Sequence, residues 1–276
     1  MKFKPVFATL FFLIPLIAVS AQKPAIVFST QEEIGAEVAL APCKKRNERL
    51  AAVNQLFLKK GAAESDISIE KVDDTENLVV TKKGSTGEIV IVGAHYDKSG
   101  DGCGAIDNWT GIVIVANLYR TFRTLDTKKT YVFIAFDKEE LGVLGSKAMA
   151  ESIKKEDRQK YCAMVNFDSF GFAFPQAMAN ISTGSLMNLA EQASNDMKIP
   201  FSKAIVEGAN SDSEPYRKRG IPAISLHGLD NRWKAFLHSS RDKVESIDTG
   251  SVYLGYRHGL VLLSKVENGA CADLRK

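Results

Sequence analysis

The fold is decided by the stretch EIVIVGAHYDKSGDGCGAID, residues 88–107. It opens with four β-branched residues, 89–92, which carry no charge and are typical of a central strand buried on both faces of a parallel sheet. We expect this strand to end at Gly93 and the chain beyond it to present His95 and Asp97. In open α/β sheets, ligands bind beyond the carboxyl ends of the strands. The stretch therefore predicts a functional site at that edge of the sheet.

Apolar strands alternate with amphipathic helices along the rest of the chain, which predicts one α/β domain whose core strands are mostly parallel. An early pair of strands joined by a short turn predicts an antiparallel edge, and hence a mixed sheet. The other strands are expected at 66–72, 77–81, 130–136, 161–167 and 221–226. The helices are expected within 31–60 and 141–155, and at 108–124, 185–197, 213–219 and 251–266.

Residues 1–21 have the composition of a secretory signal peptide. Two lysines precede the apolar run 6–19, and the small residues VSA at 19–21 fill the cleavage positions. The run is short for a membrane span. We therefore expect cleavage after Ala21, a secreted or periplasmic location, and a single mature domain over residues 22–276 that carries no membrane anchor.

The composition is that of an ordinary globular chain, with 45% hydrophobic and 25% charged residues among 276. The formal net charge is only +3, and nothing in the charge pattern favours nucleic acid as a partner.

The four cysteines, Cys43, Cys103, Cys162 and Cys271, contain no CxxC pair, so a cysteine zinc site is not indicated. One disulfide is plausible in an oxidising compartment, but the spacing leaves its pairing open. Cys162 begins an apolar strand, and we expect it to be a buried free thiol.

Acidic and imidazole side chains follow each of the main apolar strands. They are His95, Asp97, Asp107, Glu139, Glu140, Asp168 and His238. Because the carboxyl ends of parallel strands meet at one edge of a sheet, these side chains should converge. Two histidines and three carboxylates are the ligand set of a paired divalent metal site, in which one carboxylate bridges. Such a pair activates a water, and a further carboxylate must move the water's proton.

The motifs around these residues resemble, in order, those of the co-catalytic zinc peptidases of family M28 in clan MH. They are HYD at 95–97, GAIDNWTG at 104–111, FDKEELGVLGS at 136–146, NFD at 166–168, GIPA at 220–223 and the late His238. The resemblance covers roughly residue 78 to the end of the chain. It implies a three-layer αβα sandwich on a mixed, mostly parallel, eight-stranded sheet, with two Zn²⁺ ions per chain.

The resemblance also implies a metal-binding role for five residues. His95 and Asp168 would hold one zinc ion. Glu140 and His238 would hold the other, and Asp107 would bridge the two.

Two further residues are predicted by the resemblance to serve catalysis. Glu139 would be the general base, and Asp97 would orient the imidazole of His95. The peptide bond between Asp107 and Asn108 matches a position where the family often has a cis bond.

The chain departs from the family pattern at two positions. Ile106 stands where many members have a second acidic residue, although the bridging position after it is kept. Ser213 stands where many members have the histidine of a Ser-Asp-His motif, so the substrate pocket is less well defined than the metal ligands. Of the remaining histidines, we expect His258 to be structural and His227, at the end of a strand, to be a candidate substrate contact.

The predicted function is a secreted zinc aminopeptidase that removes N-terminal residues from peptides. One alternative is a glutaminyl cyclase-like enzyme with a single zinc, whose pocket Trp109 and Trp233 could line. Another is a carboxypeptidase of the same family, in which the basic residues 217–219 could bind a substrate carboxylate. A binding domain that has lost its metals is a third, although the intact ligand set argues against it. The pattern predicts neither the preferred residue nor the oligomeric state.

Overall fold

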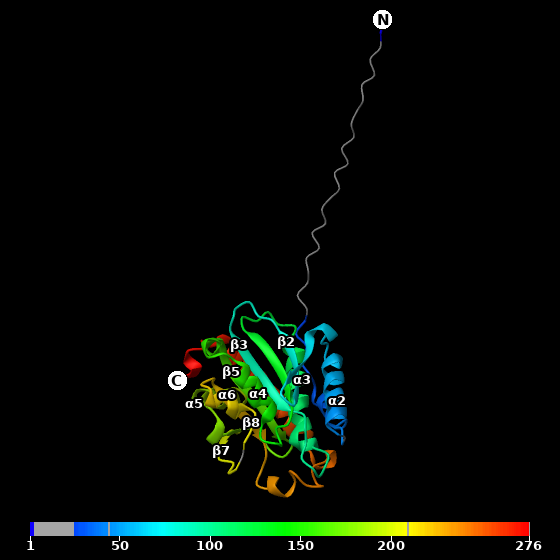
Figure 1. The fold of residues 1–276 in the computed structure, drawn as a ribbon, viewed down its shortest axis with the longest axis vertical. Coiled ribbons are helices and arrows are strands. Elements are labelled where there is room, and N and C mark those ends of the chain that lie inside the picture. The colour runs from blue at the N-terminus through cyan, green and yellow to red at the C-terminus, as the bar shows by residue number, and fades with distance from the viewer. Residues whose placement is uncertain (3–24, 44, 209, 276) are drawn as a thin grey trace.

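The computed structural model describes residues 1–2, 25–43, 45–208 and 210–275. Within them, one eight-stranded sheet lies between two layers of helices (Figure 1). The predicted αβα sandwich on a mixed eight-stranded sheet is therefore confirmed. Of the expected signal peptide, residues 1–21, the part from residue 3 onward lies outside the described residues. Every helix in the described part of the chain is too short or too polar to cross a membrane.

The strands are β1 Ile67–Val72, β2 Thr75–Lys82, β3 Ile89–His95, β4 Thr130–Phe136, β5 Tyr161–Phe170, β6 Gln176–Met178, β7 Ser202–Ala204 and β8 Ala223–Gly228. Across the sheet they run in the order β1-β2-β4-β3-β5-β8-β6-β7. The four central strands, β4, β3, β5 and β8, are parallel. On either side of them, β2 and β6 pair antiparallel, so the expected antiparallel hairpin lies at one edge.

The helices are α1 Gln31–Val38, α2 Arg46–Lys59, α3 Thr110–Phe122, α4 Leu144–Ser152, α5 Gly184–Met197, α6 Ser213–Lys218 and α7 Thr249–Asn268. On one face, α3 and α7 pack on the central strands, with α1, α2 and α5 packed against them. On the other face, α4 and α6 cover β2, β5 and β8. The two layers bury the sheet from both sides, as a parallel core requires.

β3 shows why the decisive stretch forms a central strand. Successive side chains of a strand point to opposite faces. Val90 and Val92 accordingly join the larger core under α3, whereas Ile91 joins the smaller core under α4 and α6. Only glycine fits at position 93, because a Cβ atom there would collide with the ring of Phe136 on β4.

Two strands continue beyond their predicted ends. β3 runs on to His95 because that residue still pairs with Phe136 of β4. β5 runs on to Phe170, which pairs with Gly228 of β8 after a register shift. The predictions that β3 ends at Gly93 and that Asp168 follows its strand are therefore wrong. His95 and Asp168 are held by strand backbone, which fixes their directions more firmly than a loop would.

The strands β6 and β7 were not predicted. Each has three residues, which is too short for the alternation of apolar and polar side chains that identifies a strand. They extend the sheet beyond β8, and the loop after β7 reaches the edge where the site lies.

The cysteines form two disulfides, Cys43–Cys103 and Cys162–Cys271. The prediction that Cys162 is a free thiol is wrong, although the residue is buried as expected. The chain that follows α7 places Cys271 against the start of β5. The paired cysteines are 60 and 109 residues apart in the sequence, so only the folded structure brings them together.

Candidate metal centre

The register of the central strands brings the predicted residues to one edge of the sheet. His95 lies beside Phe136, the last residue of β4, so the chain leaving β4 passes next to the imidazole. Gly93 lies beside Asn166 of β5, which places Asp168 near the end of β3. The ends of three neighbouring strands therefore supply a histidine, the Glu139–Glu140 pair and an aspartate.

Asp107 is brought in by the turn 105–109 that precedes α3. Its peptide bond to Asn108 is cis, as the resemblance implies. The buried side chain of Asn108 donates to the carbonyl of Phe167 at 2.9 Å and accepts from the backbone N–H of Ser169 at 3.0 Å. These bonds tie the turn to β5 on both sides of Asp168.

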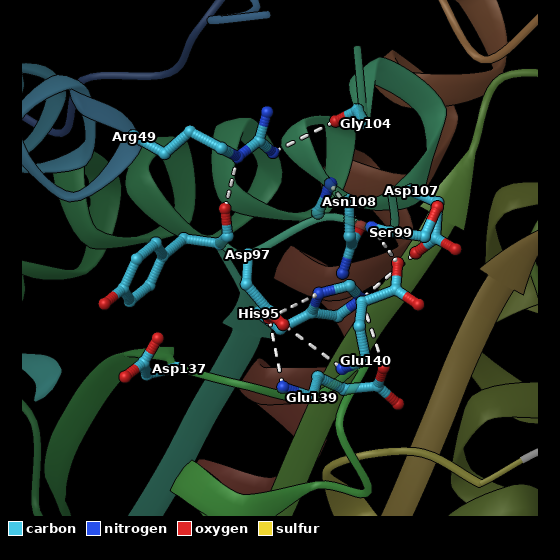
Figure 2. Close-up of polar contacts among 12 residues, drawn as sticks. Arg49, His95, Asp97, Ser99, Gly104, Asp107, Asn108, Asp137, Glu139 and Glu140 are labelled. Carbon is cyan, nitrogen blue, oxygen red and sulfur yellow. Dashed lines mark hydrogen bonds and ion pairs between the residues drawn. The ribbon is translucent and has the colours of Figure 1, made fainter. Parts of the chain in front are cut away.

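Five of the predicted residues form two groups that share Asp107. The groups are His95, Asp107 and Asp168, and Asp107, Glu140 and His238; in each, one possible ligand atom from every residue lies within 4.8 Å of the others. Figure 2 shows the side chains of His95, Asp107 and Glu140 turned toward one another. Imidazole nitrogens and carboxylate oxygens in such groups are the donors that zinc takes. The structure thus brings together all five predicted metal ligands.

The imidazole of His95 has the surroundings of a metal ligand. It is buried, and its Nε2 atom lies 3.1 Å from Oδ1 of Asp107, 3.8 Å from Oδ1 of Asp168 and 3.9 Å from Oε2 of Glu139. Neither ring nitrogen makes a hydrogen bond of acceptable geometry. A buried nitrogen ringed by three carboxylates but without a hydrogen bond fits a position for a cation between them.

His238 completes the second group from the opposite side. Its Nε2 atom lies 3.1 Å from Oδ2 of Asp107 and 3.0 Å from Oε2 of Glu140. The His238 side chain is 59% exposed, whereas that of His95 is 1% exposed. The second group is therefore the one that meets solvent, and the first group is enclosed.

The crowded carboxylates perturb one another. Burial, together with the neighbouring acids Asp168, Asp212 and Asp107, raises the pKa of Glu139 well above its usual range. Burial and the charge of Asp107 raise the pKa of Glu140 to about 7. Burial opposes ionisation of Asp107 too, but the hydrogen bond with His238 and the nearby imidazole of His95 outweigh it and lower the pKa. The cluster holds more negative charge than its two histidines balance, so bound divalent cations would reduce the repulsion among its carboxylates.

Asp97 connects His95 to the two glutamates. Its Oδ1 atom lies 3.3 Å from Nδ1 of His95 and accepts from the backbone N–H of Glu139 at 3.0 Å. Its Oδ2 atom accepts from the N–H of Glu140 at 3.2 Å (Figure 2). The carboxylate therefore holds the turn after β4 against the imidazole, which is the position that the predicted orienting role requires.

Two buried supports of the ligands were missed in the sequence. Ser211 donates its hydroxyl to Oδ2 of Asp168 at 2.6 Å. Asp242 accepts from the backbone N–H groups of Ile106 at 2.7 Å and Asp107 at 3.3 Å. Ser211 lies in the Ser-Asp pair that the family pattern singles out, which was a usable signal. Nothing in the sequence around Asp242 distinguishes it from a solvated loop acid.

A cavity of about 440 Å³ opens beside the second group. Its lining includes Asp107, Glu139, Glu140, Asp168 and His238. The remainder combines the apolar side chains of Met178, Val206, Leu229, Trp233 and Leu237 with the polar ones of Ser169, Glu207 and Asn210. A concave apolar wall facing a few convergent polar groups is the usual form of a small-ligand site.

A larger cavity of about 820 Å³ lies on the other side of Glu140, against the start of α2. Of the predicted site residues it touches only Asp97 and Glu140. The smaller cavity, which touches both ligand groups, is therefore the better candidate for the substrate site.

Several residues considered in the sequence lie away from the substrate cavity. Trp109 is buried and donates its indole N–H to the carbonyl of Glu37 at 2.9 Å. His227 is buried with Nδ1 accepting from the N–H of Leu229 at 3.2 Å, and His258 is buried with Nε2 2.8 Å from the carbonyl of Ala190. Only Trp233, among the residues considered for the pocket, lines the cavity.

Ser213, which differs from the family pattern, and the basic residues 217–219 also lie away from the substrate cavity. Ser213 is buried and accepts a hydrogen bond from Ser225 at 2.8 Å, so it does not face substrate. Lys218 pairs with Glu214 at 3.2 Å, and Arg219 donates to backbone carbonyls. Within the described chain, none of residues 217–219 lines the substrate cavity.

A family model for peptidase family M28 matches residues 77–254. The chain belongs to peptidase family M28. The matched range contains all seven predicted site residues, and the family expected from the motifs is confirmed. It leaves out α1 and α2, which lie before residue 77.

The chain is similar to several known proteins. One is the aminopeptidase YwaD of Bacillus subtilis, which is 27% identical over 184 residues. That match covers 63% of this chain and 40% of the relative. A probable leucine aminopeptidase of Trichophyton verrucosum is 29% identical over 211 residues, covering 65% of this chain and 55% of the relative. The chain thus spans about half the length of these two relatives.

Among solved structures, a zinc aminopeptidase from Bacillus subtilis has a similar fold, with a TM-score of 0.64 and 21% identity over 72% of this chain and 52% of that one. A glutaminyl cyclase of an Acidobacteriales bacterium superposes with a TM-score of 0.75 and 15% identity, over 90% of this chain and 98% of that one. At these identities the likeness concerns the fold alone. The fold is therefore shared by hydrolases and cyclases, and the site must separate the two.

Proposed function

We propose that this family M28 chain is a zinc aminopeptidase that uses two zinc ions per chain. The observation that carries the proposal is the pair of ligand groups that share Asp107. His95 and Asp168 would hold one ion, Glu140 and His238 the other, and the two oxygens of Asp107 would each serve one ion. When bound, such a metal pair activates a water and polarises the scissile carbonyl.

Glu139 is the proposed general base. It lies in the substrate cavity, within 3.9 Å of His95, and is not needed to complete either ligand group. Its carboxylate takes a proton from the attacking water and passes it to the leaving amine. A raised pKa suits this work, because the group must hold the proton between the two steps.

Asp97 is proposed to keep this arrangement in place. It accepts hydrogen bonds from the backbone N–H groups of Glu139 and Glu140. These bonds fix the position of the turn after β4 that carries both glutamates. Its contact with Nδ1 of His95 leaves Nε2 free to face the metal.

The proposed substrates are peptides with a free N-terminus and an apolar first residue. The wall formed by Met178, Val206 and Leu229, with Trp233 and Leu237, suits an aliphatic side chain. The name leucine aminopeptidase carried by one relative agrees with such a pocket.

Two observations favour this proposal over its alternatives. A single-zinc glutaminyl cyclase would leave the enclosed group of His95, Asp107 and Asp168 without a purpose. A carboxypeptidase would require a cation near the metals for the substrate carboxylate, and none of the basic residues 217–219 lines the substrate cavity in the described chain.

We also propose that the protein is exported and cleaved after Ala21. The support is the sequence pattern of residues 1–21, together with two disulfides, which are typical of proteins in oxidising compartments.

A panel of amino-acid amides and short peptides tests the proposed activity. Leucine amide and Leu-initiated peptides should lose their first residue, with activity removed by a chelator and restored by zinc. Release of ammonia from N-terminal Gln peptides, without hydrolysis of any aminoacyl amide, would instead indicate the cyclase.

A further inference from the structure

The start of α2 lies outside the region that the family model matches, yet it reaches the metal centre. Arg49, on the first turns of this helix, extends over the turn that carries Asp97 and toward the segment that leads to Asp107 (Figure 2). A residue of the amino-terminal region is thus inserted between two loops of the matched domain.

The guanidinium of Arg49 is completely buried, and its N–H groups donate to backbone carbonyls. Nε donates to the carbonyl of Tyr96, which lies between His95 and Asp97. Nη1 donates to the carbonyl of Cys103 at 2.8 Å, and Nη2 donates to that of Gly104 at 3.0 Å. A planar fork with fixed N–H directions can hold two chain segments at a set separation, whereas a flexible ammonium cannot.

The segment that Arg49 holds leads directly to the shared ligand. Gly104 has a φ of 62°, and a Cβ atom there would press on the side chain of Lys98 and on the carbonyl of Asp107. The turn is therefore compact, and only two residues separate Gly104 from Asp107. A displacement of the Gly104 carbonyl would be passed to the carboxylate that both ligand groups use.

Two further contacts hold the same segment. The disulfide joins Cys103 to Cys43, three residues before α2 begins. On the other side, the N–H of Cys103 donates to the carbonyl of Asp242 at 2.7 Å. Among these described contacts, those of Arg49 also include the loop after β3, so this side chain links the backbone next to His95 with the backbone before Asp107.

The charge of Arg49 acts in the same direction. Among the described contacts, its donors bond only to carbonyls, but the carboxylates of Asp97, Asp242 and Asp107 all act on it at longer range. Burial lowers the pKa of the guanidinium to about 10, so it remains a cation at neutral pH. A buried cation next to an excess of carboxylates offsets part of the repulsion among them.

We propose that Arg49 is a positioning residue of the metal centre, which fixes the separation of the His95 and Asp107 backbones and so sets zinc affinity. The inference rests on the proposed two-zinc site, but zinc affinity can be measured without turnover. It gives the region before residue 77 a function in the site that the family model does not contain.

The test compares the substitutions Arg49→Met and Arg49→Lys with Arg120→Met as the matched control. Arg120 is a partly buried arginine on α3 that pairs with Glu33 at 2.7 Å and lies outside both cavities at the site. Zinc affinity is measured on the full chain by competition with a chromogenic chelator, and the stability of each metal-free variant by thermal unfolding.

We expect Arg49→Met to weaken zinc binding by about 10- to 100-fold, the usual effect of removing a group that orients ligands. Arg49→Lys should recover part of the affinity, because it keeps the charge but not the fork. Arg120→Met should lower the unfolding temperature without changing zinc affinity. In variants that turn over, kcat should fall more than KM rises, since the ligands rather than the substrate pocket are displaced.

The inference is overturned if Arg49→Met binds zinc as tightly as the unchanged protein, or if Arg120→Met weakens zinc binding equally. If Arg49→Met does not fold, Arg49→Lys decides: unchanged zinc affinity would refute the positioning role. A protein that binds two zinc ions but hydrolyses no aminoacyl substrate would refute the proposed aminopeptidase. The zinc affinities of the variants would still test the role of Arg49 in that case.

Discussion

Oδ2 of Asp107 lies 3.1 Å from Nε2 of His238, although the two residues are 131 positions apart in the sequence. The other oxygen of the same carboxylate, Oδ1, lies 3.1 Å from Nε2 of His95. Asp107 therefore stands between two imidazoles, one at the end of β3 and the other in the segment between β8 and α7. If one carboxylate binds two metal ions, its removal should weaken the binding of both.

Removal of the charge at Asp107 should empty both sites. We expect Asp107→Asn to retain far less zinc than the unchanged protein, and His238→Ala to lose chiefly one ion, because His238 belongs to one ligand group only. The measurement is zinc per chain by atomic absorption after dialysis. Asp101→Asn is the control, since Asp101 is an exposed acid of the same loop. Full zinc occupancy in Asp107→Asn would contradict the shared-ligand assignment.

Neighbouring glutamates should give opposite results. Glu140→Gln should lower zinc content, because it removes a charged ligand of the second group. Glu139→Gln should keep both ions and still lower kcat by about 10²- to 10⁴-fold, because an amide cannot accept the proton of water. KM should change much less, since the proton moves mainly in the transition state. Loss of zinc from Glu139→Gln, with retention in Glu140→Gln, would show that the two roles are exchanged.

Zinc binding should release protons in a number that depends on pH. In the metal-free protein, burial raises the pKa of Glu140 to about 7, and the hydrogen bond with Asp107 raises that of His238 to about 9. Both residues must be unprotonated to ligate zinc. Below pH 7 both should lose a proton on binding. Between these two values His238 should still do so, together with His95, whose pKa the surrounding carboxylates raise well above its usual range despite burial, so affinity should increase with pH. Titration calorimetry in two buffers of different ionisation enthalpy measures the release. A constant affinity across this range would contradict the assignment of both ligands.

Export should produce a chain that begins at Gln22. The small residues at 19–21 place the cleavage after Ala21, and Ala21→Arg should block it, because a large charged residue does not fit the cleavage position. Intact mass is the safer measurement, since a cyclised Gln22 would prevent N-terminal sequencing. An exported protein whose mass includes residues 1–21 would refute the cleavage.

Motifs at strand ends made much of the site predictable. HYD at 95–97 and the glutamate pair lie at or just beyond the ends of β-branched or aromatic strands, and parallel strands on one sheet must bring such ends together. The predicted ligands did converge for this reason. The exact strand ends did not follow, because the pairing of Phe170 with Gly228 depends on β8, which is more than 50 residues further along the chain.

The supports of the site were not predictable from local pattern. Arg49 reads as one of several charged residues of an amphipathic helix, and only the tertiary structure removes it completely from solvent. The same holds for Asp242, whose loop position gives no sign that it accepts from the backbone of Asp107. The disulfide partner of Cys162 was missed because 109 residues separate the two cysteines. Long-range contacts of single side chains leave no periodicity in the sequence.

The proposed two-zinc aminopeptidase can be tested by counting bound zinc while activity is restored. The purified protein is stripped with a chelator and titrated with zinc, and hydrolysis of leucine amide is followed at each addition. We predict that activity returns with zinc binding and that occupancy saturates at two ions per chain. Saturation at one ion with ammonia released from N-terminal Gln peptides, or full hydrolysis without zinc, would contradict it.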